Sequence, residues 1–357
     1  MNNEKKYQIL SVFLVFQWAF YQFIAHYPMV IEKYYSNGLY ILISKIFRVV
    51  FGWIPFSVGD FIYFFGGVLI VYHLRKYIKS NSFKFKNLIF RILGTLSVIY
   101  FLFNISWGLN YYRIPVEHTL NFKNEKFSTK DLVQFTEQLI YKINKVQVEI
   151  TKNDTLIVQN PDNKSKILNQ AFLSYNSLAK EHQRFSISNK SVKKSLFSLP
   201  LTYMGFAGYL NPFSGEAQVN KLIPKNNFAA TSCHEIAHQT GIGLESEANF
   251  VGYLAATNYN NNYFKYSGYL LALRYCLTDV YRLDEAKFNE LKALINKGIL
   301  KDIKQSQDFY KSYQNWSEEY FKFFYDSFLK ANQQKDGIKS YHKMVSLLIN
   351  YHKTVPL

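Results

Sequence analysis

The sequence predicts a mainly α-helical membrane protein, with three N-terminal transmembrane helices followed by an α+β domain of many helices and a small sheet. Long apolar runs occur only in the first third of the 357 residues. The remainder shows apolar residues at three- and four-residue steps, which is typical of amphipathic helices. One short segment, 192–220, is rich in glycine and β-forming residues. We place the membrane anchor at 1–107 and the extramembrane domain at 108–357.

Each of the three apolar runs is long enough to cross a bilayer. The first, Tyr7–Ile31, contains no Asp, Glu, Lys or Arg, and the second is interrupted only by Asp60. A spanning helix needs about 20 such residues. Buried core helices are the alternative, and a cleavable signal peptide is a rival for the first run. Two further spans and the lack of a clean cleavage site favour an uncleaved anchor. The predicted spans are about 8–27, 53–74 and 90–110.

The charge distribution predicts the orientation of these spans. Residues 1–107 hold eleven basic and three acidic side chains, so their net charge is +8 of the total +17. The segment 75–91 between spans two and three is basic and has no acid, so it should face the cytoplasm. The C-terminal domain would then be extracytoplasmic, in the periplasm if the membrane is a bacterial inner membrane. No Arg-rich run or nucleic-acid motif is present, so we expect the lipid bilayer as a partner and no nucleic acid.

Two features between the spans carry further expectations. The stretch 39–52 places Lys45 and Arg48 among aliphatic residues, as in an amphipathic helix at the outer membrane interface. A carboxylate such as Asp60 at membrane depth is a candidate functional group. We favour the simpler interpretation, a polar group at the start of a helix, because Pro55 and Gly59 mark a helix boundary there.

In the domain, helix signals surround one sheet-like segment. Helices are expected from Ser128 to about Val148, over 164–182, and from 225 to about 351. The segment 192–220 reads as a hairpin-like sheet element with a turn before Gly215. The two cysteines, Cys233 and Cys276, are expected to be small buried thiols rather than a disulfide.

The residues with the clearest chemistry are His234, Glu235 and His238. Histidines four residues apart on a helix lie on one face, where their imidazoles can share a divalent ion at about 2.0–2.1 Å each. The adjacent Glu235 can accept a proton from an activated water. This is the HExxH arrangement of zinc-dependent peptidases. The alternative is two helical histidines that flank a glutamate by chance, although Gly241 supplies a helix stop just after the motif.

A catalytic zinc site uses three protein ligands and leaves one position open. The third ligand could be Glu245 or Glu247, and we favour Glu245. In zincins with a glutamate ligand, an Asp four residues later supports a ligating histidine, and Asn249 occupies that position here. Its amide would support the histidine less strongly than a carboxylate. The related three-histidine pattern is excluded because Leu244 stands where its third histidine would be.

Substrate contacts are predicted with less information. The segment Tyr209–Asn220 precedes the motif helix and could be an edge strand along which an extended substrate lies. Its alternating polar residues, Glu216, Gln218 and Asn220, would then bind substrate. An ordinary exposed strand is the alternative. Candidates to stabilise an oxyanion are Tyr253, Arg274, Tyr341 and His342.

Several motifs together resemble the bacterial membrane proteins of domain-of-unknown-function family 3810. They are Trp107-Gly-Leu-Asn-Tyr-Tyr-Arg113, Gly208-Tyr-Leu-Asn-Pro-Phe-Ser-Gly-Glu-Ala-Gln-Val-Asn220, His234–His238 and Glu245-Ser-Glu-Ala-Asn-Phe250. The resemblance implies three N-terminal spans followed by a gluzincin-like HExxH zinc metallopeptidase domain, and names no substrate. The Glu-x-x-Ala-Asn piece is also similar to the third-ligand helix of gluzincins such as CAAX-processing peptidases.

The sequence therefore predicts a membrane-anchored zinc metallopeptidase with one Zn²⁺ per chain. It would hydrolyse peptide bonds of an unknown peptide or protein substrate by zinc-activated water, with Glu235 as general base. A catalytically silent zincin-like protein with a binding or structural role is the alternative. An intramembrane protease is disfavoured, because the motif is expected to lie in a polar domain far from the three spans.

Overall fold

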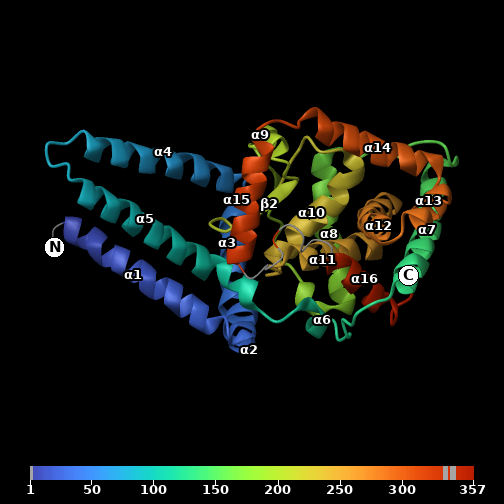
Figure 1. The fold of residues 1–357 in the computed structure, drawn as a ribbon, viewed down its shortest axis with the longest axis horizontal. Coiled ribbons are helices and arrows are strands. Elements are labelled where there is room, and N and C mark those ends of the chain that lie inside the picture. Colours follow the sequence, from blue (N-terminus) through green and yellow to red (C-terminus); the bar gives the residue numbers. More distant parts are fainter. Residues whose placement is uncertain (1–2, 333–336, 338–342) are drawn as a thin grey trace.

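The computed structural model describes residues 3–332, 337 and 343–357. It is mainly helical, with one small sheet. Three long helices, α1, α4 and α5, project together from one side of a helical body that contains the sheet (Figure 1). The predicted fold class is confirmed.

The three projecting helices are long and apolar enough to cross a membrane, as predicted. They are α1 (Asn3–Ile24), α4 (Val58–Ile78) and α5 (Phe85–Ser106). Helix α4 begins later than the expected residue 53, because Ser57 forms an N-cap whose Oγ accepts the backbone N–H of Asp60 at 3.0 Å. Asp60 thus lies in the first turn of a helix, as the simpler interpretation of that residue proposed.

Between α1 and α4 the chain forms α2 (Pro28–Val30), the π-helix η1 (Ile31–Leu39) and α3 (Tyr40–Phe51). Helix α3 has two unlike faces, as the sequence predicts. Its polar face, with Ser44 and Arg48, is buried, and the Arg48 Nε donates to the Ser188 carbonyl at 2.9 Å. The basic group therefore attaches α3 to the domain rather than facing lipid headgroups. The exposed residues of α3 are the aliphatic Ile41, Leu42, Ile46, Val49 and Val50 together with Lys45.

The sheet has three strands, β1 (Val192–Lys194), β2 (Gly208–Asn211) and β3 (Glu216–Val219), in the order β1-β3-β2. Strands β2 and β3 form the predicted hairpin, antiparallel and with Asn211 opposite Glu216. Their connection ends at Gly215, whose φ of +63° suits glycine. Strand β1 pairs in parallel with β3, so β3 is the central strand and β2 lies at an edge.

Helices surround the sheet and form the core. Helix α10 (Lys225–Gln239) contacts β2 and β3 on one side and α8, α11 and α12 on the others. The helix predicted from Ser128 is α7, which opens with a capping box between Ser128 and Asp131. The other domain helices are η2 (Gly108–Tyr112), α6 (Val116–Thr119), α7 (Thr129–Thr151), α8 (Lys164–Glu181), η3 (Gln183–Phe185), α9 (Ser198–Tyr203), α11 (Glu245–Asn258), α12 (Asn262–Leu283), α13 (Glu285–Ala293), α14 (Lys297–Ser312), α15 (Glu318–Ala331) and α16 (Lys343–His352).

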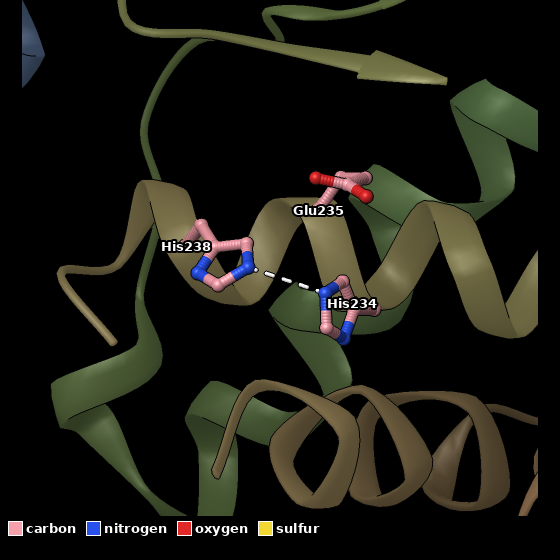
Figure 2. Close-up of side chains that lie close together, drawn as sticks. All are labelled: His234, Glu235 and His238. Atoms are coloured by element: carbon pink, nitrogen blue, oxygen red, sulfur yellow. Dashed lines mark hydrogen bonds between the residues drawn. The ribbon is translucent and has the colours of Figure 1, made fainter. Parts of the chain in front are cut away.

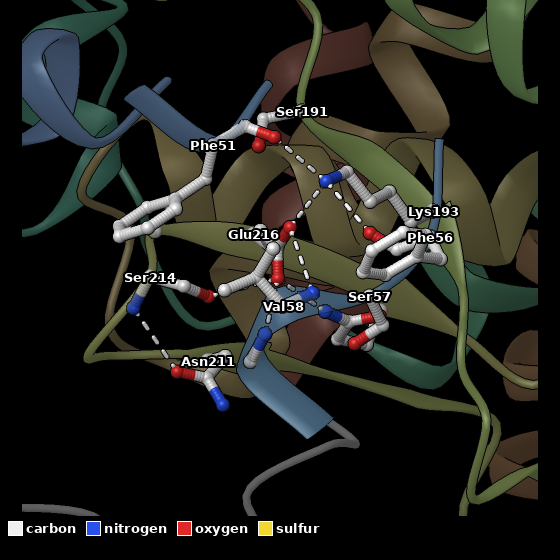
Figure 3. Close-up of polar contacts among 12 residues, drawn as sticks. Phe51, Phe56, Ser57, Val58, Ser191, Lys193, Asn211, Ser214 and Glu216 are labelled. Atoms are coloured by element: carbon white, nitrogen blue, oxygen red, sulfur yellow. Dashed lines mark hydrogen bonds and ion pairs between the residues drawn. The ribbon is translucent and has the colours of Figure 1, made fainter. Parts of the chain in front are cut away.

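Segment 31–60 and the helical body are joined by buried polar contacts. The Glu216 carboxylate on β3 accepts the N–H of Gly59 at 2.6 Å and of Val58 at 3.3 Å, and it pairs with Lys193 (Figure 3). A second buried ion pair, Arg113 with Glu32 of η1, has an N–O distance of 2.5 Å. Removing one partner of such a buried pair typically costs about 3–5 kcal/mol. Segment 31–60 is therefore packed onto the domain.

Candidate metal centre

The two motif histidines meet on one face of α10. Their Nε2 atoms are 3.2 Å apart, as expected for residues one helical turn apart (Figure 2). The Nδ1 of His238 lies 2.7 Å from the Ile242 carbonyl, so Nδ1 donates to that oxygen and Nε2 is the atom that can take a second proton or bind a metal ion. Helix α10 ends at Gln239, and Gly241 adopts a φ of +85°, which confirms the predicted helix stop.

Glu245 approaches both histidines from the next helix. It is the first residue of α11, and its Oε2 lies 3.2 Å from the His234 Nε2 and 3.7 Å from the His238 Nε2. Helices α10 and α11 can come this close because Gly252 has no side chain: a Cβ there would meet the backbone N of His234 at 2.8 Å. The small residue in α11 thus sets the distance between the first histidine and the glutamate.

The three converging atoms fit a zinc ion. Two atoms bound to tetrahedral zinc at about 2.0–2.1 Å lie about 3.3–3.4 Å apart. The observed separations of 3.2, 3.2 and 3.7 Å bracket this value. Two imidazole nitrogens and one carboxylate oxygen are also a donor set that catalytic zinc sites use. His234, Glu235 and His238 form a group that could hold a metal ion.

The electrostatics of this group favour a cation among the three atoms. Burial alone would lower the pKa of His238, but the Glu245 carboxylate raises it to about 9. Burial would raise the pKa of Glu245, yet His238 and His234 hold it well below its usual range. The site therefore stabilises positive charge at the His238 Nε2, which a divalent ion would supply in place of a proton.

The Glu235 side chain lies on the side of α10 that faces the sheet (Figure 2), and a carboxylate oxygen is still within 4.8 Å of a nitrogen of each histidine. A Cβ on Gly208 of β2 would lie 2.5 Å from the Glu235 Oε1, so glycine leaves room for this carboxylate beneath the edge strand. The other oxygen, Oε2, is buried and has no hydrogen-bond partner in the part of the chain that the structure describes. Burial raises the pKa of Glu235 to about 7. A carboxylate with a free acceptor atom at the site can take up a proton.

The two residues near Glu245 have other partners. The Glu247 carboxylate accepts the backbone N–H of Val116 at 3.1 Å, and burial raises its pKa to about 8. Asn249, predicted to support a ligating histidine, instead donates to the Tyr275 hydroxyl at 3.2 Å. The His234 Nδ1 is buried and has no hydrogen-bond partner within the residues that the structure describes. Of the two acidic candidates, only Glu245 lies beside the histidines.

The three residues expected to bind substrate lie on or beside the central strand and are fully buried. Glu216 pairs with Lys193, and the Gln218 amide donates to Glu216 at 2.9 Å. The Asn220 amide donates to the Thr202 hydroxyl at 2.8 Å. Their side chains therefore stabilise the sheet, and this placement argues against direct contact with a substrate. β3 is the central strand of the sheet, and of the two strands of the hairpin only β2 lies at an edge.

Of the four residues proposed to stabilise an oxyanion, the structure places one at the cavity. Arg274 of α12 lines the cavity beside the histidines. Tyr253 lies in the core, where its hydroxyl is 3.0 Å from the His352 Nε2. Tyr341 and His342 lie outside the described residues. Cys233 and Cys276 are both buried and free, as expected.

Three aromatic residues at the site were missed by sequence reasoning. The Trp107 Nε1 donates to the His238 carbonyl at 3.2 Å, and the two rings are 5.8 Å apart. The Tyr325 hydroxyl on α15 donates to the Glu245 Oε1 at 3.0 Å. The Tyr275 hydroxyl accepts the hydrogen bond from the Asn249 amide. Trp107 directly follows α5, so the expectation that the motif lies far from the spans is wrong.

A mostly apolar cavity of about 1010 Å³ opens beside the motif. Its walls come from α4, α5, η2, α9, β2, α10, α11, α12, α14 and α15. His234, Glu235, His238 and Glu245 all face it. Drug-sized ligands or short peptide segments occupy cavities of this size. The histidines and both glutamates are therefore accessible to a bound molecule.

Comparison with known proteins gives one match. Residues 35–349 match the family described as "Protein of unknown function (DUF3810)". No curated protein and no solved structure matches the chain. The match spans η1 to α16 and includes the candidate metal centre.

Proposed function

The chain belongs to the DUF3810 family, and from its site we propose that it is a membrane-anchored zinc metallopeptidase. The observation that carries this proposal is the convergence of the two histidine Nε2 atoms and the Glu245 Oε2 within 3.7 Å, next to a buried Glu235. We assign His234, His238 and Glu245 as zinc ligands, one ion per chain. A zinc ion held there would polarise a carbonyl group and lower the pKa of water.

The residues of the chain supply the rest of the reaction. Glu235 accepts a proton from the attacking water as the water oxygen bonds to the carbonyl carbon. It then passes that proton to the amine nitrogen as the C–N bond breaks. His238 is fixed by the Ile242 carbonyl, and Tyr325 orients Glu245 through its second oxygen. Arg274 at the cavity wall is the described candidate for stabilising the developing oxyanion.

A catalytically silent protein would need the two histidines and Glu245 but not Glu235. The Glu235 carboxylate is buried with one oxygen unpartnered in the described part of the chain, which is costly unless the group has a chemical role. This feature supports an enzyme.

The proposal is tested by metal analysis and hydrolysis of the full-length protein beside a Glu235→Gln variant. We expect about one zinc per chain in both, and cleavage of a mixture of fluorogenic peptides by the parent alone. A His234→Gln variant should lose zinc. A parent without bound metal, or equal cleavage by parent and Glu235→Gln, would overturn the proposal.

A further inference from the structure

The cavity beside the metal centre extends to the membrane helices. Tyr63 of α4 and Ile99 and Phe103 of α5 line it together with His234 and Glu235. All three lining residues lie within helices long enough to span a bilayer. Side chains near membrane depth therefore share one cavity with the candidate catalytic residues.

Helices α4 and α5 separate as they approach the domain. Figure 1 shows them joined by the loop around residues 79–84 and diverging toward the body of the protein. Helix α5 packs along α1, whereas α4 has few contacts with α5 and is attached to the domain at its first turn. Tyr63 stacks on Tyr209 of β2, with ring centroids 6.0 Å apart. The cavity is thus lined from both helices, by Tyr63 of α4 and by Ile99 and Phe103 of α5.

The edge strand β2 runs from the catalytic glutamate to the start of α4. Gly208, its first residue, lies against the Glu235 carboxylate. Asn211, its last residue, lies against Gly59, where a Cβ would meet the Asn211 amide group at 2.6 Å. Among the described strands, β2 pairs only with β3. An extended peptide that added to the free edge of β2 would pass from Glu235 toward the membrane helix.

Helix α15 gives the cavity a second membrane-facing wall. Tyr325 and Phe328 face inward, and the Phe328 ring packs against Phe103 of α5 at 6.2 Å. The opposite side of α15 and the residues before it expose large aromatic rings, and aromatic residues are enriched where membrane meets water. The exposed aromatic residues of this segment are Trp316, Tyr320, Phe321, Phe323, Phe324 and Phe328, of which Phe328 also lines the cavity. The exposed charged residues Glu319 and Lys322 lie among these rings. A mixture of aromatic and charged side chains suits the interface between bilayer and water, so the bilayer surface is the occupant that it fits.

We propose that the substrate is a membrane-embedded polypeptide cut close to the bilayer surface. Its apolar segment enters between α4 and α5, and the adjoining extended segment pairs with β2 and presents a peptide bond to Glu235. This inference rests on the proposed peptidase activity, since it names the substrate class of the same site. The reaction is hydrolysis of one peptide bond, with one water consumed and a carboxylate and an amine released.

The test uses the full-length protein in vesicles of phosphatidylcholine and phosphatidylglycerol. The soluble probe is a mixture of water-soluble fluorogenic peptides. In the membrane probe, each peptide of the same mixture is attached to a Leu-Ala transmembrane helix. We expect the parent to cleave the membrane probe at least tenfold faster than the soluble one. Ile99→Trp, which places a larger side chain in the part of the cavity lining that α5 supplies, should reduce this ratio at least fivefold. Val98→Trp, on the exposed neighbouring residue outside the cavity lining, should leave the ratio unchanged.

A second readout does not depend on hydrolysis. The membrane probe with a photoreactive leucine is cross-linked to the Glu235→Gln protein, and we expect adducts within α4, α5 and β2. Cleavage of neither probe by the parent would contradict the peptidase function, while the cross-links would still locate the probe. Equal cleavage of both probes, an unchanged ratio in Ile99→Trp, or cross-links confined to α1 would overturn the membrane-substrate proposal alone.

Discussion

Glu216 on the central strand accepts the backbone N–H of Gly59 at 2.6 Å and so caps the first turn of the membrane helix α4 (Figure 3). A carboxylate at a helix N-terminus is stabilised by the unpaired N–H groups and by the helix dipole. The same carboxylate pairs with Lys193 of β1. One buried residue therefore connects a candidate membrane-spanning helix to the sheet, whose strands β2 and β3 contact the motif helix α10.

Replacing Glu216 with Ala should detach α4 from the sheet. The change leaves Lys193 buried without its partner, and such changes cost about 3–5 kcal/mol. For a protein of this size we expect a fall in melting temperature of about 10 °C, measured by thermal unfolding in detergent. Hydrogen exchange at the amides of Val58 and Gly59 should rise. Glu290→Ala, which breaks only an exposed pair with Lys287, is the matched control and should change neither. An equal effect of both variants would contradict the capping role.

Glu245→Gln and Glu247→Gln should differ in zinc binding. Loss of a partner that only supports a ligand costs about 10–100-fold in metal affinity, so loss of a direct ligand should exceed this range. We therefore expect Glu245→Gln to bind zinc at least about 100-fold more weakly, as measured by competition with a chromogenic chelator. The Glu247 carboxylate accepts the Val116 N–H instead, so Glu247→Gln should bind zinc like the parent. The opposite pattern would make Glu247 the third ligand.

Gly252→Ala should separate the two helices that carry the candidate ligands. The new Cβ would meet the backbone N and Cα of His234 at 2.8 and 2.9 Å, and backbone atoms cannot give way without moving the helix. Overpacking of this kind costs about 1–3 kcal/mol. We expect a lower melting temperature and weaker zinc binding. Gly66→Ala, on a glycine of α4 with open space around it, is the control and should keep the melting temperature and the zinc affinity of the parent. Unchanged zinc binding in Gly252→Ala would show that helix spacing does not set the ligand geometry.

Local signals in the sequence were sufficient to predict several parts of the site. The four-residue spacing of His234 and His238, the helix stop at Gly241 and the acidic residue at the next helix start are each encoded within a few residues. The structure places Glu245 beside both histidines, as its position shortly after the HExxH motif suggested. Such features follow from helix geometry alone.

Long-range contacts explain what the sequence could not predict. The Tyr325 hydroxyl reaches Glu245 from 80 residues away, and only the folded chain shows that pairing. The alternating polar residues of β3 suggested an exposed strand face. Period-two spacing does not distinguish solvent exposure from burial with an internal partner, and the pairing of Glu216 with Lys193 is the second case.

The orientation of the chain in the membrane is testable from the ends of the projecting helices. The basic loop between α4 and α5 lies at the end of these helices that is far from the domain (Figure 1). If the helices span the bilayer, loop and domain lie on opposite sides, and the basic loop should face the cytoplasm. Cys233 and Cys276 are buried, so introduced cysteines can be labelled selectively. In intact spheroplasts we expect an impermeant maleimide to label Ala286→Cys, on the exposed surface of α13, and to label Ser82→Cys only after the membrane is opened. Labelling of Ser82→Cys from outside would reverse the orientation and place the proposed peptidase site in the cytoplasm.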